Sequence, residues 1–288
     1  MFEIVKNYRD NEELRHSFND LAGKTFGLNF EDWYQNGFWT DNYNPYSVVS
    51  DGRVVANVSV NHTDMEINGA VKHFLQLGTV MTEEAYRNRG LSRKIMEQIE
   101  VDFDGKVDGY YLFGNDSVLD FYPRFGFRKA KEYQYAKKVS NKGEAQVKRV
   151  IMNNPESWEQ LQDVMRRNVF GGRFDMVNNS ELIMFYVTKF MQEDVYYHEA
   201  TDTYVIAEAE EGKLFIHNVF STTLEDLDEV IALFGADIKE VTLGFVPMEA
   251  EGYTVTEYHE EDCTFFIKGE ALNVVETDKL RIPTLSHA

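Results

Sequence analysis

Residues Arg87 to Ser92 read Arg-Asn-Arg-Gly-Leu-Ser and lie between an apolar segment and an amphipathic one. A turn that opens a helix leaves backbone N–H groups without intrahelical partners, and the helix dipole adds partial positive charge there. Gly90 would let the backbone approach a ligand closely, and Arg87 and Arg89 could neutralise a pyrophosphate. The segment predicts a phosphate-binding turn, although an arginine-rich turn is often simply solvated.

The elements around this turn follow from the periodicity of the apolar residues. Leu91, Ile95, Ile99 and Phe103 recur every four residues and predict a helix after the turn. The other predicted elements of the first half are a helix over residues 11–24, a strand meander over 47–69 with turns at Asp51-Gly52 and Asn68-Gly69, a buried strand over 73–82, a strand over 110–115, a short helix over 117–126 and a final strand over 128–139. This order is typical of an α/β fold.

The second half repeats a weaker version of the same order after a polar stretch at residues 140–148. It contains a predicted hairpin over 203–220, a capped helix over 223–235, a buried strand over 240–247 and a second hairpin-like pair over 252–269. We interpret residues 1–140 and 148–288 as two domains, the second being a degenerate structural copy that has lost the glycine-rich loop.

Two motifs resemble the signatures of the GCN5-related N-acetyltransferases (GNAT). The loop motif of that family, Gln or Arg, two residues, Gly, any residue, then Gly or Ala, is matched from Arg87 through Gly90, with Ser92 replacing the last small residue. The second signature is matched by Asn115, Phe121-Tyr122 and Gly126-Phe127. The resemblance covers roughly residues 1–138. It implies a mixed, mostly antiparallel sheet flanked by helices, the acyl-CoA N-acyltransferase fold.

The resemblance also implies an acetyl-CoA site and a role for each matching residue. The strand before the loop would splay from its neighbour and bind the pantetheine arm through its backbone, and Asn115 would hydrogen-bond the same arm. Tyr122 would be the general acid that protonates the leaving CoA thiolate, although a packed amphipathic aromatic is the alternative interpretation. The backbone positions are Thr79, Val80 and Met81, and the pyrophosphate positions are Arg87, Asn88, Arg89, Gly90, Leu91 and Ser92.

The catalytic base is less well defined by the motif. The family often has a carboxylate about eleven residues before the loop, where this chain has Gln76, which cannot accept a proton. Deprotonation would then pass through water, another carboxylate or the carboxyl end of the chain. The chain further resembles the enhanced-intracellular-survival branch of the family, which acetylates aminoglycosides and lysines. That branch uses its terminal carboxylate, but this chain is too short for its last domain, so we do not transfer the role to Ala288.

Composition limits the partners. Residues 1–150 carry 20 Lys and Arg against 22 Asp and Glu, whereas residues 151–288 carry 9 against 27, within a formal net charge of −20. Such a field repels nucleic acid and anionic membranes and attracts cations. It favours a cationic small-molecule amine as acceptor, with a lysine or peptide amine as the alternative, and it also serves solubility. The chain has no long apolar run and no signal-like start, so we expect a cytoplasmic protein without membrane or nucleic-acid partners.

Other candidate residues carry weaker signals. The single cysteine, Cys263, excludes an internal disulfide, and the seven histidines show no metal-ligand spacing, so we expect no metal site. Trp33 and Trp39 either line an acceptor pocket or pack on the core. Acidic residues near them would suit a cationic amine: Glu31, Asp32 and Asp41.

Three functions remain open at this point. The first is an acetyl-CoA-dependent N-acetyltransferase that acts by direct attack of the amine. The second is a non-catalytic acyl-CoA sensor, suggested by the missing carboxylate at position 76, and a homo-oligomer is compatible with either. A nucleotide-binding protein is disfavoured because Arg89-Gly90-Leu91-Ser92 lacks the Lys-Ser/Thr ending of a phosphate-binding loop.

Overall fold

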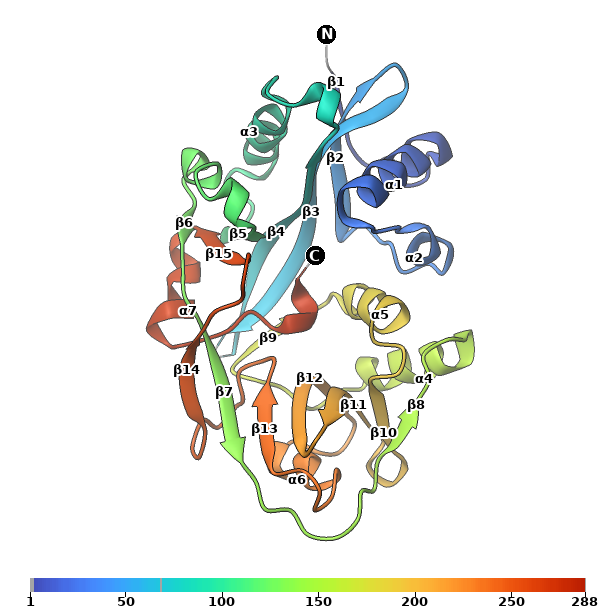
Figure 1. Cartoon of the computed structure of the whole chain (residues 1–288), viewed down its shortest axis with the longest axis vertical. Coiled ribbons are helices and arrows are strands. Elements are labelled where there is room, and N and C mark those ends of the chain that lie inside the picture. The colour runs from blue at the N-terminus through green and yellow to red at the C-terminus, as the bar shows by residue number, and fades with distance from the viewer. Residues whose placement is uncertain (1–2, 68, 288) are drawn as a thin grey trace.

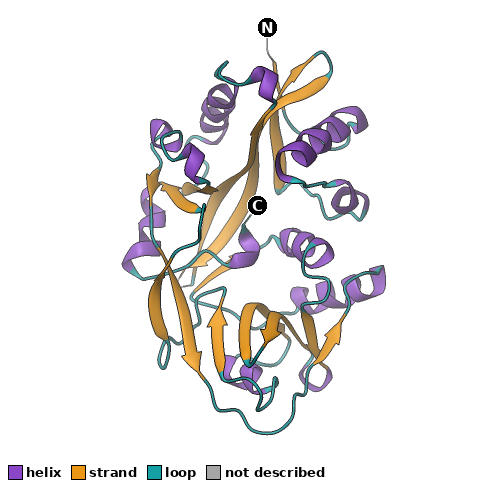
Figure 2. Cartoon of the chain, viewed as in Figure 1, coloured by secondary structure: helices purple, strands orange, loops and turns teal. Residues whose placement is uncertain are grey.

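The computed structural model describes residues 3–67 and 69–287. Two sheets follow each other along the long axis of the molecule, and helices cover both (Figures 1 and 2). The mixed fold agrees with the sequence prediction.

The first sheet is built mainly from the first half of the chain. Its strand order is β1 (Glu3–Val5), β2 (Tyr43–Ser50), β3 (Arg53–Ile67), β4 (Ala70–Thr82), β5 (Gly109–Gly114), β15 (Thr264–Lys268) and β6 (Arg128–Lys129), and β9 (Phe174–Val177) pairs with β3. Helices α1 (Glu12–Phe26) and α2 (Glu31–Gln35) pack on one face and α3 (Leu91–Phe103) on the other (Figure 1). Because side chains alternate along a strand, Val54 joins the core under α1 and Val55 the core under α3.

The second sheet has the order β14 (Thr254–Tyr258), β7 (Glu132–Lys138), β13 (Glu240–Leu243), β12 (Lys213–Ser221), β11 (Thr203–Glu210), β10 (Val195–His198) and β8 (Lys148–Val150). Its helices are α4 (Pro155–Arg166), α5 (Ser180–Lys189) and α6 (Leu227–Ala232), and α7 (Val274–Thr277) follows β15. The predicted hairpin over 203–220 is present as β11 and β12, which turn at Glu211-Gly212 with φ of 49° and 81°.

Both sheets follow one plan. Each contains one parallel pair, β4 with β5 and β12 with β13, and otherwise antiparallel neighbours. In each sheet the strand beside the second member of that pair comes from the other half of the chain: β15 lies beside β5, and β7 lies beside β13. The chain is therefore a doubled fold whose two copies exchange a strand.

This exchange corrects two sequence predictions. The strand predicted over 128–139 is two strands in different sheets, because the chain leaves the first sheet between β6 and β7. The pair predicted over 252–269 is not a hairpin, since β14 and β15 also lie in different sheets. The helix predicted over 117–126 consists of two short 3-10 turns, with Pro123 in the second. The predicted turn residue Asn68 lies outside the described residues.

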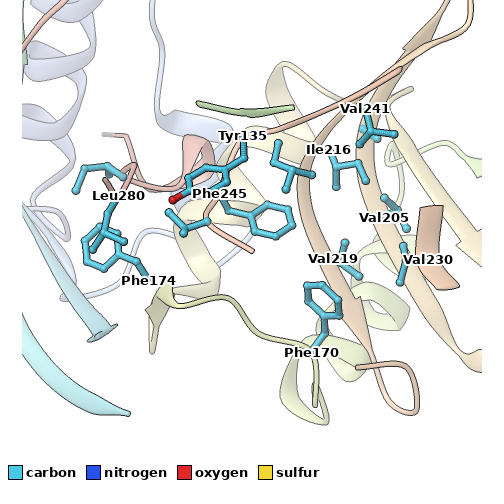
Figure 3. Packing of buried hydrophobic residues seen from close by; sticks show 14 of the residues in the cluster. Tyr135, Phe170, Phe174, Val205, Ile216, Val219, Val230, Val241, Phe245 and Leu280 are labelled. Atoms are coloured by element: carbon cyan, nitrogen blue, oxygen red, sulfur yellow. The ribbon is translucent and has the colours of Figure 1, made fainter. Parts of the chain in front are cut away.

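One hydrophobic core joins the two copies. Figure 3 shows Tyr135, Phe174 and Leu280 packed in the cluster that continues through Phe245 and Val241 into the second sheet. The same cluster includes Phe74 of the first sheet. The division into residues 1–140 and 148–288 stays a prediction. The first sheet takes β9 and β15 from beyond that boundary, and the second sheet takes β7 from before it.

Candidate active site

The site forms where β4 and β5 separate. These parallel strands pair at three positions only, the last being Gln76 with Tyr111. Beyond this pair both strands continue without pairing to each other, to Thr82 on β4 and to Gly114 on β5. The unpaired edges give the open backbone that the family resemblance predicts for a pantetheine arm.

A β-bulge shapes the β4 side of this opening. The register with β3 shifts after Gly78, and Thr79 has a φ of 47°, a left-handed conformation uncommon for a β-branched residue. Two side chains hold the bulge: Asn57 Nδ2 donates to the Thr79 carbonyl at 2.9 Å, and the Tyr43 and Thr79 hydroxyls lie 2.6 Å apart. Ser47 Oγ donates in turn to Asn57 Oδ1 at 2.8 Å. This buried network fixes the conformation of Thr79.

The predicted phosphate turn lies at the end of β4. Gly90 precedes the first residue of α3 with a φ of 73°, and its carbonyl accepts the first helical bond from the Lys94 N–H at 3.1 Å. The helix therefore begins at Leu91, with its first N–H groups directed out of the turn. Arg87 and Arg89 are exposed, and Arg89 donates to the Ala85 carbonyl at 2.8 Å. The turn has the geometry of an anion site.

Tyr122 lies on the β5 side of the opening. Its ring packs on Gly114, where a Cβ would approach Tyr122 Cε2 to 2.9 Å, so this close contact requires glycine. Tyr122 is 3% exposed and lines the cavity between the splayed strands. Burial raises the pKa of its phenol to about 12, which keeps the hydroxyl protonated at neutral pH. A protonated phenol at this position can serve as an acid.

Asn115 borders the same cavity but its side chain has a local partner. Its Oδ1 accepts from the Ser117 N–H at 3.2 Å and the Ser117 hydroxyl at 2.6 Å, which caps the 3-10 turn Asp116–Val118. The predicted hydrogen bond to a pantetheine arm would share this oxygen or use the amide nitrogen.

Gln76 and Met81 lie away from the cavity wall. Gln76 is 1% exposed and sits at the last paired position of β4, so it marks the point where the strands part. The Met81 side chain packs in the core beneath α1, which leaves only its backbone near the opening. Thr79 and Val80, by contrast, line the cavity.

The cavity extends from the splayed strands to α5, with a volume of about 350 Å³. Sequence reasoning missed its second wall, which comes from Leu182, Phe185 and Tyr186 of α5 and from Phe190 just after it. A signal was available in the sequence ELIMFYVTKF, because a helix with aromatic residues at successive positions cannot bury all of them in one core.

His287 closes one side of the cavity. Its ring stacks on Phe113 with centroids 3.8 Å apart, and its carbonyl accepts from the Tyr186 hydroxyl at 2.5 Å. Burial lowers the pKa of the imidazole to about 3, so the ring is neutral. Ala288, considered above for its carboxylate, lies outside the described residues.

The two tryptophans considered above behave differently. Trp33 lines the cavity and donates from Nε1 to the Glu181 carbonyl at 2.9 Å, which ties α2 to α5. Trp39 is 3% exposed and packs in the core, with Nε1 donating to the Tyr43 carbonyl at 2.9 Å. The nearby acids do not line the cavity: Glu31, Asp32 and Asp41.

Two features, a parallel strand pair that separates and a turn that leads from the first of these strands into a helix, are typical of the acyl-CoA N-acyltransferase fold. The chain contains both of them, in β4, β5 and α3. Residues 9–130 match the family model of the acetyltransferase (GNAT) domain. This match agrees with the predicted family for this part of the chain. No curated protein matches the chain significantly.

Solved structures share the fold of nearly the whole chain. A probable N-acyltransferase of Enterococcus faecalis is 15% identical with a TM-score of 0.58, over 93% of this chain and 72% of that one. Eis1 of Mycobacterium abscessus is 12% identical with a TM-score of 0.54, over 92% and 73%. A GCN5-related N-acetyltransferase of Kribbella flavida is 15% identical with a TM-score of 0.52, over 92% and 71%. At these identities the likeness concerns the fold, and the Eis branch stays a prediction.

Within residues 3–67 and 69–287, no helix is both long and apolar enough to cross a membrane. The same residues contain no group of three or more His, Cys, Asp or Glu side chains arranged to hold a metal ion. Cys263 is partly buried beside acidic groups, and burial raises the pKa of its thiol to about 12, which disfavours the nucleophilic thiolate.

Proposed function

We propose that the protein transfers an acetyl group from acetyl-CoA to a primary amine by direct attack. The observation that carries this proposal is the position of Tyr122, which lines the cavity where β4 and β5 separate, together with the bulged residue Thr79. A protonated phenol and an open strand edge are the two features that acyl transfer from a thioester needs at one place.

The residues present fit acetyl-CoA as the co-substrate. The N-terminus of α3, with exposed Arg87 and Arg89 beside it, suits the pyrophosphate. The stretch from Thr79 to Met81 does not pair with β5, so its edge on that side is open to the pantetheine arm. The cavity beyond Tyr122 leaves room for the acceptor amine.

These groups can account for each bond and proton that changes in the transfer. The amine nitrogen attacks the thioester carbonyl carbon, and a backbone N–H of the bulged strand stabilises the oxyanion. The C–S bond then breaks, and the Tyr122 hydroxyl gives its proton to the sulfur. The proton released from the nitrogen restores the phenol through water, so the products are an acetamide and free CoA thiol.

The test measures thiol release from acetyl-CoA with a panel of amines, for the wild type and Tyr122→Phe. Loss of a general acid lowers turnover by about 100-fold or more, and the KM for acetyl-CoA stays nearly constant. Tyr110→Phe is the matched control, since it removes a phenol from β5 outside the cavity. A parallel fall in acetyl-CoA affinity would refute the acid role of Tyr122.

The same assay decides the second candidate, an acyl-CoA sensor. It is favoured by the glutamine at position 76, where a carboxylate base is common in the family. A sensor binds acetyl-CoA saturably and releases no thiol with any amine. Turnover with a single amine would exclude it.

A further inference from the structure

The walls of the cavity carry no ionised side chain. Among the described residues that line it there is no Asp, Glu, Lys or Arg, and His287 is neutral because burial holds the pKa of its imidazole down. Nine of the nineteen lining residues are Phe, Trp or Tyr: Phe26, Phe30, Trp33, Tyr43, Phe113, Tyr122, Phe185, Tyr186 and Phe190. The chemistry of these walls suits a flat apolar molecule.

The acidic residues near the two tryptophans do not line the cavity, and two of them are paired with arginines. Glu31 accepts from Arg15 at 3.0 and 3.2 Å, and the exposed Asp41 lies 3.0 Å from Arg9 Nη1. The large acidic surplus of residues 151–288 contributes no lining side chain to the cavity. The cavity thus lacks the counter-charge that a cationic acceptor needs, which argues against the cationic amine expected from composition.

An uncharged cavity selects against protonated amines. An alkyl amine with a pKa like that of lysine, near 10.4, is neutral in roughly one molecule in 2,500 at pH 7. Moving its ammonium form into an apolar site without a partner is costly, and the neutral form is the one that attacks. An aromatic amine is already neutral at pH 7, because its nitrogen lone pair is delocalised into the ring.

The aromatic rings of the wall pack against one another. Phe30 and Phe185 stack at 5.2 Å with planes 6° apart, and the edge of Trp33 meets Phe185 at 5.4 Å. Phe26 and Phe190 line the cavity yet are 46% and 52% exposed, an unusual position for large apolar side chains. Their exposure places apolar surface where an incoming aromatic ligand would first make contact.

From these observations we propose that the acceptor is an aromatic amine, neutral at pH 7, whose ring packs against the aromatic wall that contains Trp33, Phe185 and Phe190 and whose nitrogen faces the splayed strands. The inference rests on the proposed function and names the substrate class of the same site. The apolar cavity has one competing use, which is to hold the chain of an acyl-CoA longer than acetyl-CoA.

A matched pair of acceptors tests the proposal. 4-Methoxyaniline and 4-methoxybenzylamine differ by one methylene, but only the second is protonated at pH 7. We expect kcat/KM for the aniline to exceed that for the benzylamine and for spermidine by at least about tenfold, after subtraction of the uncatalysed rate. Equal or faster turnover of the benzylamine or of spermidine would overturn the proposal and leave the proposed function intact.

Two further measurements separate a wrong acceptor class from a wrong activity. If hexanoyl-CoA is used better than acetyl-CoA with the aniline, the cavity holds the acyl chain and the proposal is wrong. If no amine releases thiol although acetyl-CoA binds, the proposed function itself fails. The panel therefore distinguishes a wrong acceptor class from a wrong activity.

Variants at the mouth of the cavity, which we define by the exposed lining residues Phe26 and Phe190, give an independent check. Phe190→Ala is expected to raise the KM for 4-methoxyaniline several-fold without changing the KM for acetyl-CoA. Met248→Ala is the matched control, because Met248 is a similarly exposed apolar residue, 55% exposed, that lies outside the cavity. An unchanged aniline KM in Phe190→Ala would count against a ring-binding mouth.

Discussion

The two parallel strand pairs, β4 with β5 and β12 with β13, both separate after a short paired stretch. The first opening contains a cavity, whereas the second is occupied by another segment of the chain. Beyond Gln76 and Tyr111 the first pair borders the cavity with Tyr122. Beyond Ile216 and Leu243, the opening between β12 and β13 is occupied by the chain segment that contains Thr284. There the Thr284 N–H donates to the Gly244 carbonyl at 2.8 Å. The second opening has no room for a pantetheine arm at that position.

The turn that follows β4 and the turn that follows β12 differ in charge. The first contains Arg87, Arg89 and Gly90 and leads into α3, a helix of 13 residues. The second contains Glu225 and Asp226 and leads into α6, which has six residues and further acids in its first turn. A phosphate is attracted to the first turn and repelled by the second. The shared strand order therefore does not by itself create an acetyl-CoA site. The charge of the turn and the space left between the strands distinguish the two copies.

The C-terminal segment serves both copies at once. Thr284 fills the second opening, where its hydroxyl lies 3.0 Å from His217 Nδ1. Two residues later the Ser286 carbonyl accepts from Tyr111 of the first sheet at 3.0 Å. His287 then forms a wall of the first cavity. The second copy thus anchors a segment that forms part of the wall of the first cavity.

The largest expected effect comes from separating the copies. A fragment of residues 1–140 lacks β15, so β5 and β6 lose their shared neighbour, and the β7 side chains that pack in the common core are exposed. We expect this fragment to show no cooperative thermal unfolding by circular dichroism, whereas the full chain unfolds cooperatively.

A nicked full chain is the control for this experiment. A protease site inserted in the loop at residues 139–147 cuts the chain and leaves every strand present. The two pieces should stay associated and keep their thiol-release activity. Cooperative unfolding of the isolated 1–140 fragment would show that the strand exchange is not needed for stability.

The comparison also shows what the sequence could predict. Local patterns identified α1, α3, β4 and β5, because apolar periodicity and the turn at Asp51-Gly52 are encoded by nearby residues. The turn at Gly90 and the position of Tyr122 followed from motifs of short span. Each of these features depends on residues close together in the chain.

The exchange of β7 and β15 could not be predicted in this way. The sequences of β7 (EYQYAKK) and β15 (TFFIK) are typical of strands but do not specify a sheet, so their partners are set by residues more than 100 positions away in the chain. The aromatic wall of α5 and the position of His287 were missed for the same reason. The cationic acceptor suggested by composition stays a prediction, because a net charge does not say which side chains reach the cavity.

A pair of glycines tests the difference between the two openings. A Cβ at Gly114 would lie 2.9 Å from the Tyr122 ring, and one at Gly244 would lie 2.5 Å from Thr284 Oγ1. Either substitution overpacks its site, at a cost of about 1–3 kcal/mol. Gly114→Ala should lower kcat more than its loss of stability explains, because it displaces the acid. Gly244→Ala should lower the midpoint of urea unfolding, and it should lower kcat less than Gly114→Ala because it reaches the cavity only indirectly, through Thr284 and His287. Equal effects on kcat would mean that Tyr122 is not the acid.

The smallest expected effect concerns the two turns. The double variant Arg87→Ala/Arg89→Ala should raise the KM for acetyl-CoA by about tenfold, equal to about 1.4 kcal/mol, because two exposed charges beside a helix N-terminus are screened by solvent. The increase should shrink at high salt. Glu225→Ala/Glu229→Ala changes the charge of the equivalent turn by the same amount and should leave this KM unchanged. A lower KM in the acidic-turn variant would show that the second copy also binds acetyl-CoA, and the division of labour between the copies would be wrong.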